Sequence, residues 1–484
     1  MKTNVHLFLF AGLLLTSGCS SKQSGDAQSQ SQPNIIYILA DDLGYGDLSC
    51  YGQKRFSTPH LDQLARGGIR FTRHYSGSTV CAPSRSVLMT GLHTGHTPIR
   101  GNLEVKPEGQ TPLPASVVTL AEHLKEAGYV TGAFGKWGLG FPGSEGDPVN
   151  QGFDIFFGYN CQRYAHRYYP EYLWESSKKF YLQGNDWTNT ETYAPDVIQE
   201  KTLDFIKENR GKPFFAYVPI VIPHAELIVP EDEILTKYLG LFPEEPYEGN
   251  PGADYGPEMN IGMYCSQKNP HATFAAMVHR LDVYVGQIVS LLDELGIAEN
   301  TLVMFTSDNG PHMEGGADPV FFNSSAGLRG VKRDLYEGGV RVPFIVSWPG
   351  TVKEGLTSDH ISAFWDVLPT VGELTGFKPE KTDGISFLPE LLGREQARHE
   401  FLYWEFHEKG GKQALLKGEW KALRLNVREN PHGPLELYNL ETDPSEQKNV
   451  ADQHPDLVQT FSRMMDGQRE ASEVFNFGRV TGTL

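Results

Sequence analysis

Two pairs of adjacent polar residues have the composition of a metal site. Asp41 and Asp42 follow one short apolar run, and Asp308 and Asn309 follow another. Such runs are typical of buried strands, and the carboxyl ends of these strands form the site in an open α/β sheet. Three carboxylates and one amide oxygen are hard ligands suited to Ca²⁺ or Mg²⁺. Acids after strands are also common as helix caps and turn formers, so either pair alone would be ambiguous.

A five-residue segment between these pairs resolves the ambiguity. Cys81-Ala82-Pro83-Ser84-Arg85 matches the Cys-x-Pro-x-Arg signature of the formylglycine-dependent sulfatases, members of the alkaline phosphatase superfamily. The chain resembles that family from about Asn34 to Pro349, because further sulfatase motifs occur in the family's order. They are Asp41-Asp42, Gly135-Lys136-Trp137, Pro223-His224, Ser307-Asp308-Asn309-Gly310, Gly330-Val331-Lys332 and Glu337-Gly338-Gly339-Val340-Arg341-Val342-Pro343.

The resemblance implies a modified residue and a metal ion. Cys81 is the residue that a sulfatase-maturating enzyme would convert to formylglycine. The hydrated aldehyde then attacks sulfur, forms a covalent sulfo-enzyme intermediate, and later expels sulfate with its second hydroxyl. The implied metal is Ca²⁺, with Mg²⁺ as the alternative. Its ligands by resemblance are residue 81 and four side chains, namely Asp41, Asp42, Asp308 and Asn309.

The same motifs imply the other catalytic roles in sulfate monoester hydrolysis. A sulfate ester needs positive charge around its oxygens in the transition state, and Arg85, Lys136 and Lys332 supply it in a chain of net charge −18. Asp308 is expected to act as the base toward the nucleophile. His224 is expected to be the general acid toward the leaving alcohol, supported by Lys332.

One position departs from the family pattern. Many sulfatases have a histidine two residues after the lysine of the Gly-Lys-Trp motif, where this chain has Gly138. That histidine helps to orient or deprotonate the diol in the family, so its loss leaves the elimination step without an assigned residue. His93 or His96, which follow the Cys81 segment, are candidates to supply an imidazole, with an ordinary loop role as the alternative.

The residues that contact the sugar lie outside the shared motifs. His166 and Arg167 belong to an aromatic stretch, Cys161–Trp174. Aromatic rings stack on pyranose faces while His and Arg bind hydroxyls, so this stretch is predicted to contact sugar, with simple packing as the alternative. His312 and Glu314 form a second candidate pair. The predicted substrate is a sulfated glycan, and the resemblance suggests galactose sulfate or N-acetylgalactosamine sulfate.

Two other functions are open at this point. Phosphatases and phosphodiesterases of the same superfamily use two zinc ions, additional His ligands and a Ser or Thr nucleophile. Here the nucleophile position is Cys81, and Asp308 is followed by Asn309 instead of His. The other is a non-catalytic glycan-binding lipoprotein. Such a protein would not need the cations Arg85, Lys136 and Lys332 together with the predicted general acid His224.

The elements that position these residues follow from hydrophobic patterns. Four short apolar runs predict buried parallel strands: Ile35–Leu39, Phe214–Val218, Thr301–Phe305 and Phe344–Val346. Helical patterns between them predict a covered α/β sheet. After about Thr375, short aromatic strands and one helix predict a small α+β appendage with an antiparallel sheet. With the resemblance, we expect an alkaline-phosphatase-like large mixed sheet flanked by helices over residues 33–375 and a C-terminal subdomain over residues 376–484.

Composition excludes several classes of protein. The 484 residues are 39% hydrophobic and 21% charged, as in soluble globular proteins. The sequence has no run of basic residues, so nucleic acid is not an expected partner. Five Cys residues without a CxxC pair argue against a disulfide framework and against a zinc-thiolate site.

The first residues have the pattern of an export signal. Lys2 precedes an apolar run, and small residues ending at Cys19 resemble a bacterial lipobox. Residues 1–18 are therefore predicted to be a signal peptide and Cys19 to be lipidated, with a plain cleaved signal as the alternative. Residues 19–32 are rich in Ser and Gln and would form a tether. The expected protein is an exported carbohydrate sulfatase in the periplasm or on the outer membrane, attached only through the lipid on Cys19.

Overall fold

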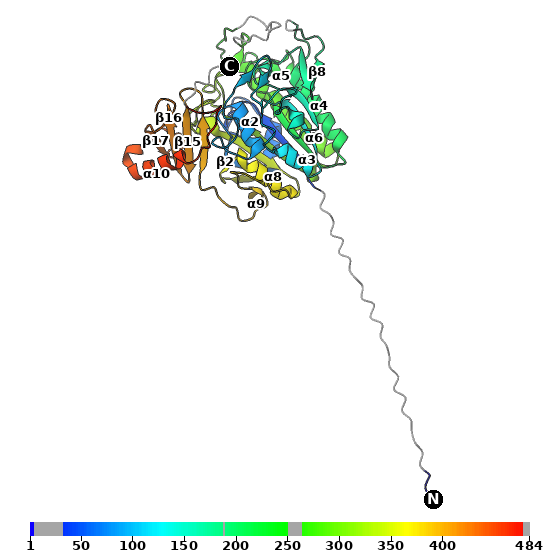
Figure 1. Cartoon of the computed structure of the whole chain (residues 1–484). Helices are drawn as coiled ribbons and strands as arrows, with labels where there is room; N and C mark the ends of the chain where they lie inside the picture. Colours follow the sequence, from blue (N-terminus) through cyan, green and yellow to red (C-terminus); the bar gives the residue numbers. More distant parts are fainter. Residues whose placement is uncertain (4–31, 187–188, 250–263, 478–484) are drawn as a thin grey trace. The chain divides into compact units, whose positions relative to one another are not determined.

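The computed structural model describes residues 1–3, 32–186, 189–249 and 264–477 (Figure 1). Its contacts divide the chain into Met1–Ser31 and Gln32–Leu484, and the fold below is that of Gln32–Leu484. Cys19, nearly all of the predicted signal peptide and nearly all of the tether lie outside the described residues. Within the described ranges, no helix combines the length and apolar character that a membrane crossing needs.

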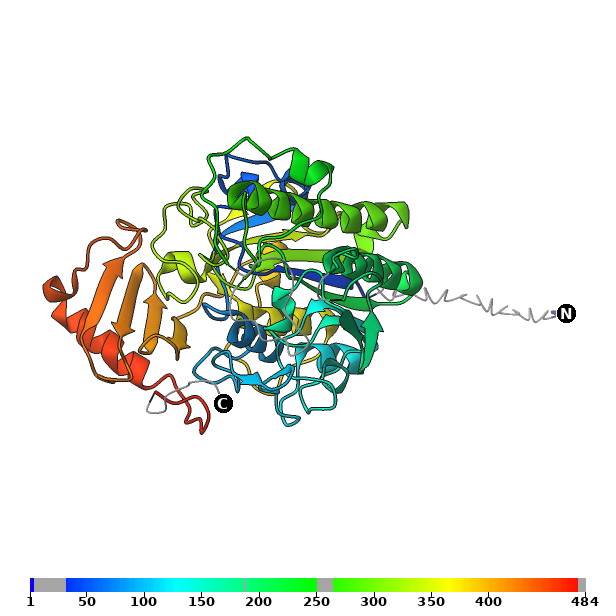
Figure 2. The same cartoon turned by 90° about the horizontal axis from the view of Figure 1, so that it is seen from above.

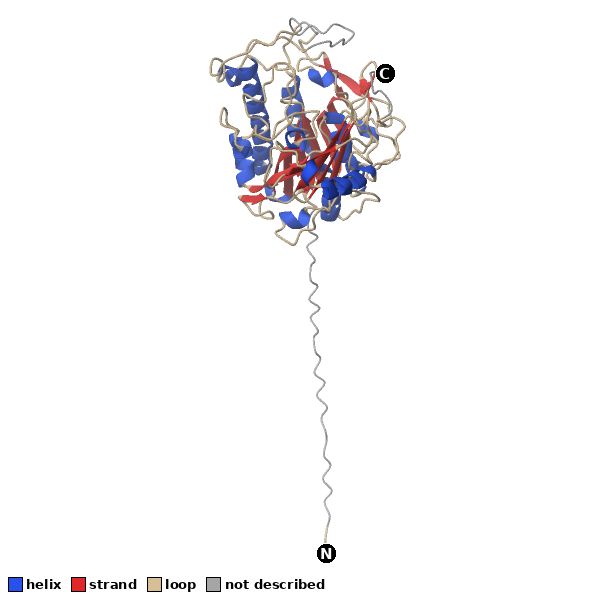
Figure 3. Ribbon diagram, turned by 90° about the vertical axis from the view of Figure 1, so that its left-hand side faces the viewer, coloured by secondary structure: helices blue, strands red, loops and turns tan. Residues whose placement is uncertain are grey.

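Among the described residues of this unit, eleven strands form one mixed sheet. Figure 3 shows it running through the fold. The spatial order of its strands is β12 (Leu356–Ser358), β2 (Gly68–Tyr75), β11 (Arg341–Ser347), β10 (Thr301–Ser307), β1 (Asn34–Ala40), β9 (Phe214–Ile220), β5 (Val130–Lys136), β6 (Ile155–Tyr159), β7 (Tyr172–Glu175) and β8 (Lys178–Tyr181), with β13 (Ser362–Ala363) also paired to β2. The central strands β10, β1, β9, β5 and β6 are parallel, whereas β11, β2, β7 and β8 each join the sheet with antiparallel pairing.

The four apolar runs are strands β1, β9, β10 and β11, as predicted. β1, β9 and β10 are parallel to one another, but β11 is antiparallel to both β10 and β2, so the predicted parallel direction was wrong for β11. The chain leaves β10 at Ser307, stays at that edge of the sheet through residues 308–340, and enters β11 from the same edge at Arg341. A strand entered from the edge at which its neighbour ended must run back along that neighbour.

Helices cover both faces of the sheet (Figure 2). Because side chains alternate along a strand, Ile36 and Ile38 of β1 join one core while Ile35 and Leu39 join the other. The α-helices of the described residues are α1 (Pro59–Arg66), α2 (Cys81–Thr90), α3 (Leu120–Glu126), α4 (Ala194–Asn209), α5 (Glu233–Thr236), α6 (Pro270–Glu294), α7 (Glu337–Val340), α8 (Val367–Thr375), α9 (Leu388–Leu391) and α10 (Pro455–Asp466). Helices α1, α4 and α6 pack in the first core, and α2, α3 and α8 pack in the second.

A separate antiparallel sheet forms in the C-terminal part, drawn in orange in Figure 2. The predicted antiparallel sheet and its helix, α10, are confirmed. The proposed boundary between residues 375 and 376 stays a prediction, since α8 ends at Thr375 but Gln32–Leu484 forms one compact unit. The strands are β14 (Leu402–Phe406), β15 (Lys412–Lys417), β16 (Trp420–Leu425) and β17 (Leu435–Asn439), and a small ribbon elsewhere pairs β3 (Glu104–Val105) with β4 (Gly109–Gln110).

Candidate active site

The predicted oxygen ligands leave the sheet side by side. β1 and β10 pair in parallel and end at the same level, so Asp41 and Asp42 emerge next to Asp308 and Asn309. All four residues are fully buried. The Asp42 backbone N–H donates to Asp308 Oδ1 at 3.1 Å, and Asn309 Nδ2 donates to Asp42 Oδ1 at 2.7 Å. Asp42 has φ +64°, a left-handed conformation that is rare outside glycine and is often found at functional sites.

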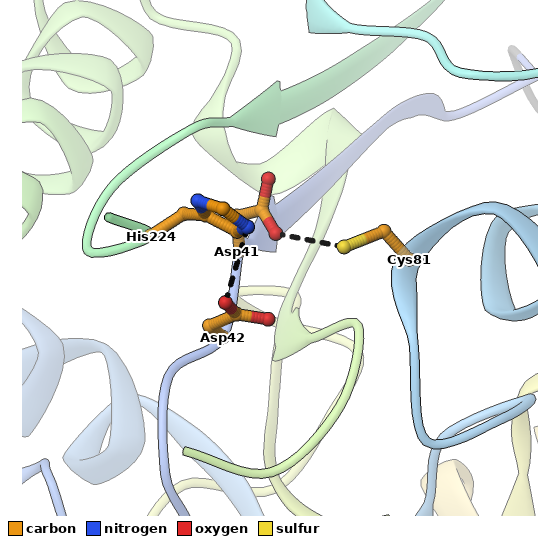
Figure 4. A group of neighbouring side chains, drawn as sticks. All are labelled: Asp41, Asp42, Cys81 and His224. Atoms are coloured by element: carbon orange, nitrogen blue, oxygen red, sulfur yellow. Dashed lines mark hydrogen bonds and ion pairs between the residues drawn. The ribbon is translucent and has the colours of Figure 1, made fainter. Parts of the chain in front are cut away.

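Cys81 begins helix α2 and points at these carboxylates (Figure 4). Its thiol donates to Asp41 Oδ1 at 3.3 Å, and Lys136 Nζ lies 3.3 Å from the same sulfur. Burial, followed by the charges of Asp308 and Asp41, raises the pKa of the Cys81 thiol well above its ordinary value. The unmodified side chain is therefore a protonated thiol, which is a poor nucleophile.

Three cationic side chains balance the three buried carboxylates. Arg85, one turn after Cys81 on α2, donates from Nη2 to Asp308 Oδ2 at 2.8 Å. Lys136 Nζ at the end of β5 lies 2.6 Å from Asp41 Oδ2. Lys332 Nζ lies 2.6 Å from Asp42 Oδ2. These contacts keep several buried charges paired, which is the condition under which charges are tolerated in a protein interior.

Burial and the neighbouring charges shift the pKa values of Asp41 and Asp308 in opposite directions. Burial opposes ionisation of Asp41, but Lys136 and other nearby cations hold the pKa of Asp41 well below its usual range. Burial and the charge of Asp41 raise the pKa of Asp308 to about 6. Of these two carboxylates, Asp308 is therefore the better proton acceptor.

His224 lies between Lys332 and Asp42. Its Nε2 is 3.0 Å from Lys332 Nζ and 3.4 Å from Asp42 Oδ2, and its Nδ1 is hydrogen-bonded to the Ala225 carbonyl. A carbonyl only accepts, so Nδ1 carries the proton and Nε2 accepts from Lys332. Burial and then Lys332 lower the pKa of His224 well below its ordinary value.

A cavity of about 330 Å³ opens above these groups. His407, Glu408 and Phe475 form part of its wall, so the C-terminal part of the chain contributes to the cavity. A larger cavity of about 990 Å³ elsewhere contains none of the predicted catalytic residues. The lining of the smaller cavity is Cys81, Gly101, Asn102, Leu103, Glu104, Lys106, Gln110, Gln162, His166, His224, Tyr264, Lys332, Arg333, His407, Glu408 and Phe475.

The predicted sugar-contacting residues have different surroundings. His166 lines the cavity, and its ring stacks on His224 with centroids 4.7 Å apart. Arg167 and His312 are buried and are not among the lining residues. Arg167 Nη1 lies 2.7 Å from Glu226 Oε2, and His312 Nε2 lies 3.1 Å from the Pro223 carbonyl. Only His166 of the three therefore faces the cavity in this structure.

The space beside Gly138 is filled by neither candidate histidine. His96 Nδ1 lies 2.9 Å from Asp383, and the ring of His93 stacks on His96 at 4.2 Å. Neither histidine is among the residues that line the cavity. A Cβ atom at Gly138 would instead lie 2.3 Å from Gln162 Nε2, so Gln162 occupies the volume that a side chain at residue 138 would take.

Sequence reasoning missed several residues of the cavity wall. Arg333 forms an ion pair with Glu314, its Nε lies 3.7 Å from Glu408 Oε2, and it has φ +75°. Arg333 directly follows Lys332, a predicted catalytic residue, and this position could have indicated from the sequence that Arg333 lies near the site. No sequence signal connects Glu408 or Gln110 with the site, because each reaches it only through the tertiary fold. Gln162 lies within the predicted sugar-contacting stretch, Cys161–Trp174, but was not singled out there.

The oxygen cluster fits a divalent cation. Asn309 Oδ1 is buried and has no hydrogen-bond partner among the described residues, so it can accept a metal ion. Asp41, Asp42, Cys81 and His224 each offer an atom, and these atoms lie within 4.8 Å of one another. The His224 nitrogen is directed at Lys332, which leaves a cluster dominated by oxygen and suited to a hard cation.

Comparisons with known proteins agree with this geometry. Residues 33–377 match the family described as Sulfatase, and residues 330–471 match the family described as N-sulphoglucosamine sulphohydrolase, C-terminal. An N-acetylgalactosamine-6-O-sulfatase of Bacteroides thetaiotaomicron is 29% identical over 95% of this chain and 97% of its own length. Human arylsulfatase A is 31% identical over 92% of this chain and 89% of its own length. The crystal structure of Ps i-CgsB in complex with k-i-k-neocarrahexaose superposes with a TM-score of 0.74, 27% identity, and coverage of 91% of this chain and 94% of that one.

The mixed sheet, the buried oxygen cluster and Cys81 at the start of α2 define an enzyme of the alkaline phosphatase superfamily. The chain belongs to the sulfatase family. It is a sulfuric ester hydrolase.

Proposed function

We propose that this sulfatase removes sulfate from a sulfated glycan after Cys81 has been converted to formylglycine by a sulfatase-maturating enzyme. The observation that supports this proposal most directly is the position of Cys81, the first residue of the Cys-Ala-Pro-Ser-Arg segment. It lies at the cavity wall, with Asp41 and Lys136 each 3.3 Å from its sulfur. The hydrated aldehyde at this position supplies a hydroxyl nucleophile that the thiol cannot replace.

The chain's own side chains bind and orient the sulfate. Arg85, Lys136 and Lys332 direct positive charge at the cavity end where residue 81 lies, and an entering sulfate gives these cations an additional anionic partner. Asp41 accepts the hydrogen bond from residue 81 and orients it. Asp308 has the higher proton affinity of the two carboxylates, and we assign the base to it.

His224, supported by Lys332, delivers the proton to the leaving alcohol. Since Nδ1 of His224 donates to a carbonyl, Nε2 is the nitrogen that exchanges a proton in the cavity. The Lys332 ammonium donates to that nitrogen at 3.0 Å. The lowered pKa of His224 makes a protonated Nε2 a strong acid toward the departing alkoxide, while Lys332 keeps its own proton and stays hydrogen-bonded to the imidazole.

We infer that the metal is Ca²⁺, with Mg²⁺ as the alternative. Asp41, Asp42, Asp308 and Asn309 would hold it together with residue 81, and the unpartnered Asn309 Oδ1 supports this assignment. A divalent cation in this cluster neutralises carboxylate charge and polarises the sulfate.

Sugar contact is proposed for His166 because it faces the cavity and stacks on His224. Arg167 and His312 then support the cavity wall through Glu226 and Pro223, and contact between either residue and a sugar stays a prediction. Galactose sulfate and N-acetylgalactosamine sulfate are the proposed candidates, since one relative is named an N-acetylgalactosamine-6-O-sulfatase.

Export completes the proposal. The signal-like residues 1–18 and the lipobox-like Cys19 support a periplasmic or outer-membrane lipoprotein. A glycan sulfatase in that compartment meets its polymeric substrate outside the cytoplasm.

A two-zinc phosphatase is the less favoured alternative. A second zinc ion would need further imidazole ligands, and His312 is the other histidine of the described residues that is grouped with Asp42. Its Nε2 is bonded to the Pro223 carbonyl at 3.1 Å, and its Nδ1 accepts from the Glu314 N–H at 3.2 Å. Both ring nitrogens are therefore already engaged.

Co-expression with a maturating enzyme tests the proposal. Mass spectrometry of the peptide containing residue 81 should show loss of the thiol mass, and the matured protein should release sulfate from an aryl sulfate and from a sulfated glycan. Cys81→Ala should abolish both activities while leaving the melting temperature nearly unchanged. Full activity of the unmodified thiol protein, or a preference for phosphate monoesters, would refute the assignment.

A further inference from the structure

Two buried glutamines form one wall of the active-site cavity. Gln110 is fully buried and Gln162 is 6% exposed, and both line the cavity that contains Cys81 and His166. The Gln110 side-chain oxygen accepts from the Gln162 backbone N–H at 3.2 Å, which ties the two residues together. Gln110 Nε2 and both amide atoms of Gln162 have no hydrogen-bond partner among the described residues.

Unpartnered buried amides are energetically unfavourable. A buried donor or acceptor without a partner costs about 1–3 kcal/mol. A carboxamide cannot relieve this cost by changing its protonation state. Two such groups on the wall of a catalytic cavity therefore have free hydrogen-bonding capacity that a bound ligand can take up in place of water.

Gly138 provides the space for the Gln162 side chain. Its φ of +79° is a left-handed value, and a Cβ atom at this residue would come within 2.3 Å of Gln162 Nε2. The Gly138 N–H donates to the Asn160 carbonyl at 3.0 Å, which fixes this segment beside the one that carries Gln162. A side chain at residue 138 would displace the carboxamide from its present position.

We propose that Gln110 and Gln162 form a neutral subsite that recognises an uncharged sugar substituent able both to donate and to accept hydrogen bonds. A hydroxyl and an acetamido group share this chemistry. The inference rests on the proposed glycan substrate and deepens it. The two Nε2 groups donate and Gln162 Oε1 accepts. A second sulfate or a carboxylate at this place has no proton for Gln162 Oε1, so it would leave that oxygen unsatisfied.

Substrate pairs test the subsite on the matured, metal-loaded enzyme. The panel contains 4-nitrophenyl sulfate, sulfated hexoses, their deoxy analogues lacking one hydroxyl at a time, and the matching N-acetylhexosamine sulfates. Gln162→Ala should lower kcat/KM by about 10- to 100-fold on the preferred sugar sulfate and by less than about 3-fold on the aryl sulfate. On the analogue that lacks the recognised group, the variant and the wild type should be equally slow. The identity of that analogue distinguishes a hydroxyl from an acetamido group.

Gly138→Ala tests the same subsite by displacement. The new Cβ should push the Gln162 carboxamide aside and reproduce the selective loss on sugar sulfates. Gly350→Ala is the matched control, because Gly350 has φ +76° and no atom lies within 4 Å of the position that a Cβ would take there. Gln199→Ala controls for loss of a buried glutamine, since Gln199 Nε2 donates to the Tyr284 carbonyl at 3.1 Å between helices α4 and α6. Both controls should retain the wild-type preference among substrates.

Binding provides a readout that does not need turnover. In a Cys81→Ser background, Gln162→Ala should weaken calorimetric binding of the preferred sugar sulfate by about 10-fold or more. Equal kinetic losses on aryl and sugar sulfates, unchanged kinetics on both, or unchanged binding would each overturn the subsite. Absence of any sulfatase activity in the matured wild type would instead overturn the proposed function, while the binding comparison still tests the two glutamines.

Discussion

At the scale of single residues, the site depends on balanced buried charge. Asp41, Asp42 and Asp308 are fully buried, and each is in contact with a cationic side chain. Removing one member of such a set leaves an uncompensated charge in the interior, which is strongly destabilising. We propose that the same cations bind the sulfate, so their geometry matters as much as their charge.

Arg85→Lys tests geometry at constant charge. Arg85 donates to Asp308 Oδ2 from both Nε and Nη2, at 3.2 and 2.8 Å, and also donates to the Lys136 carbonyl. A lysine cannot form this planar set of bonds. We expect kcat on an aryl sulfate to fall by roughly 10²- to 10³-fold. Arg463→Lys, on the exposed side of α10, should leave kcat unchanged. A loss below about 3-fold for Arg85→Lys would mean that charge alone is sufficient.

Calcium binding should stabilise the protein more at pH 7.5 than at pH 5. In the calcium-free protein the raised pKa of Asp308, about 6, exceeds that of the unfolded chain. This group contributes stability below its unfolded pKa of about 4, and the contribution is lost as pH rises through about 6. A bound cation offsets that loss. Differential scanning fluorimetry with EDTA or Ca²⁺ should show a Tm increase that is roughly 2–4 °C larger at the higher pH. Asp308→Asn should remove the difference, and equal increases at both pH values would contradict the argument.

The sequence could place the proposed site residues in one cluster where each belongs to a short contiguous motif, and their catalytic roles stay predictions. Arg85 lies four residues after Cys81 on one helix turn, and Asp41 follows a strand whose seven residues are all buried. The role of Gln162 could not be predicted, because it depends on the space beside Gly138 and on missing partners in three dimensions. The pairing of Arg167 with a buried glutamate likewise has no local pattern that would predict it.

At the scale of elements, local patterns predicted which segments are strands but not how every strand runs. The apolar run in β11 has the composition of a parallel strand, since both faces of the sheet are covered. Its direction depends on the loop that returns to the same sheet edge, and hydrophobic periodicity contains no information on that return. The contribution of the β14 end to the cavity, through His407 and Glu408, is equally a long-range effect.

Strand β15 holds the segment that carries Lys332. Lys412 Nζ donates to the Arg333 carbonyl and to Asp334 Oδ1, both at 2.7 Å. We expect Lys412→Ala to lower kcat/KM on sugar sulfates by roughly 10-fold, because it releases the backbone that positions two cavity-lining cations. Lys417→Ala is the control on the same strand, since its ion pair with Glu400 is exposed. Identical steady-state kinetics for the two variants would show that β15 does not position the segment.

At the scale of the whole molecule, the C-terminal sheet is joined to the catalytic part by buried polar contacts. Arg100 Nη1 lies 3.1 Å from Glu405 Oε1 of β14, and the Trp404 indole donates to the Ser76 carbonyl at 3.0 Å. Burial opposes ionisation of Glu405, but its hydrogen bond with His407 and the nearby arginines Arg469 and Arg100 lower the pKa of Glu405 to about 2. Contacts of this kind indicate that the predicted subdomain over residues 376–484 unfolds together with the catalytic part.

Lys421→Met tests this coupling at a buried charge cluster. Lys421 Nζ on β16 lies 2.9 Å from Glu337 and 3.2 Å from Glu446, and all three side chains are fully buried. Burial raises the pKa of Glu446 to about 7, whereas Lys421 outweighs burial at Glu337 and lowers its pKa. Without Lys421 both carboxyl groups favour the protonated form in the folded state, so stability is lost as pH rises. We expect unfolding in urea to show a loss of about 3–5 kcal/mol at pH 8 and a smaller loss at pH 5. Lys381→Met, which removes an exposed pair with Glu470, should cost at most about 1 kcal/mol at either pH. A single transition for all variants is expected, and two separate transitions would mean that the sheets unfold independently.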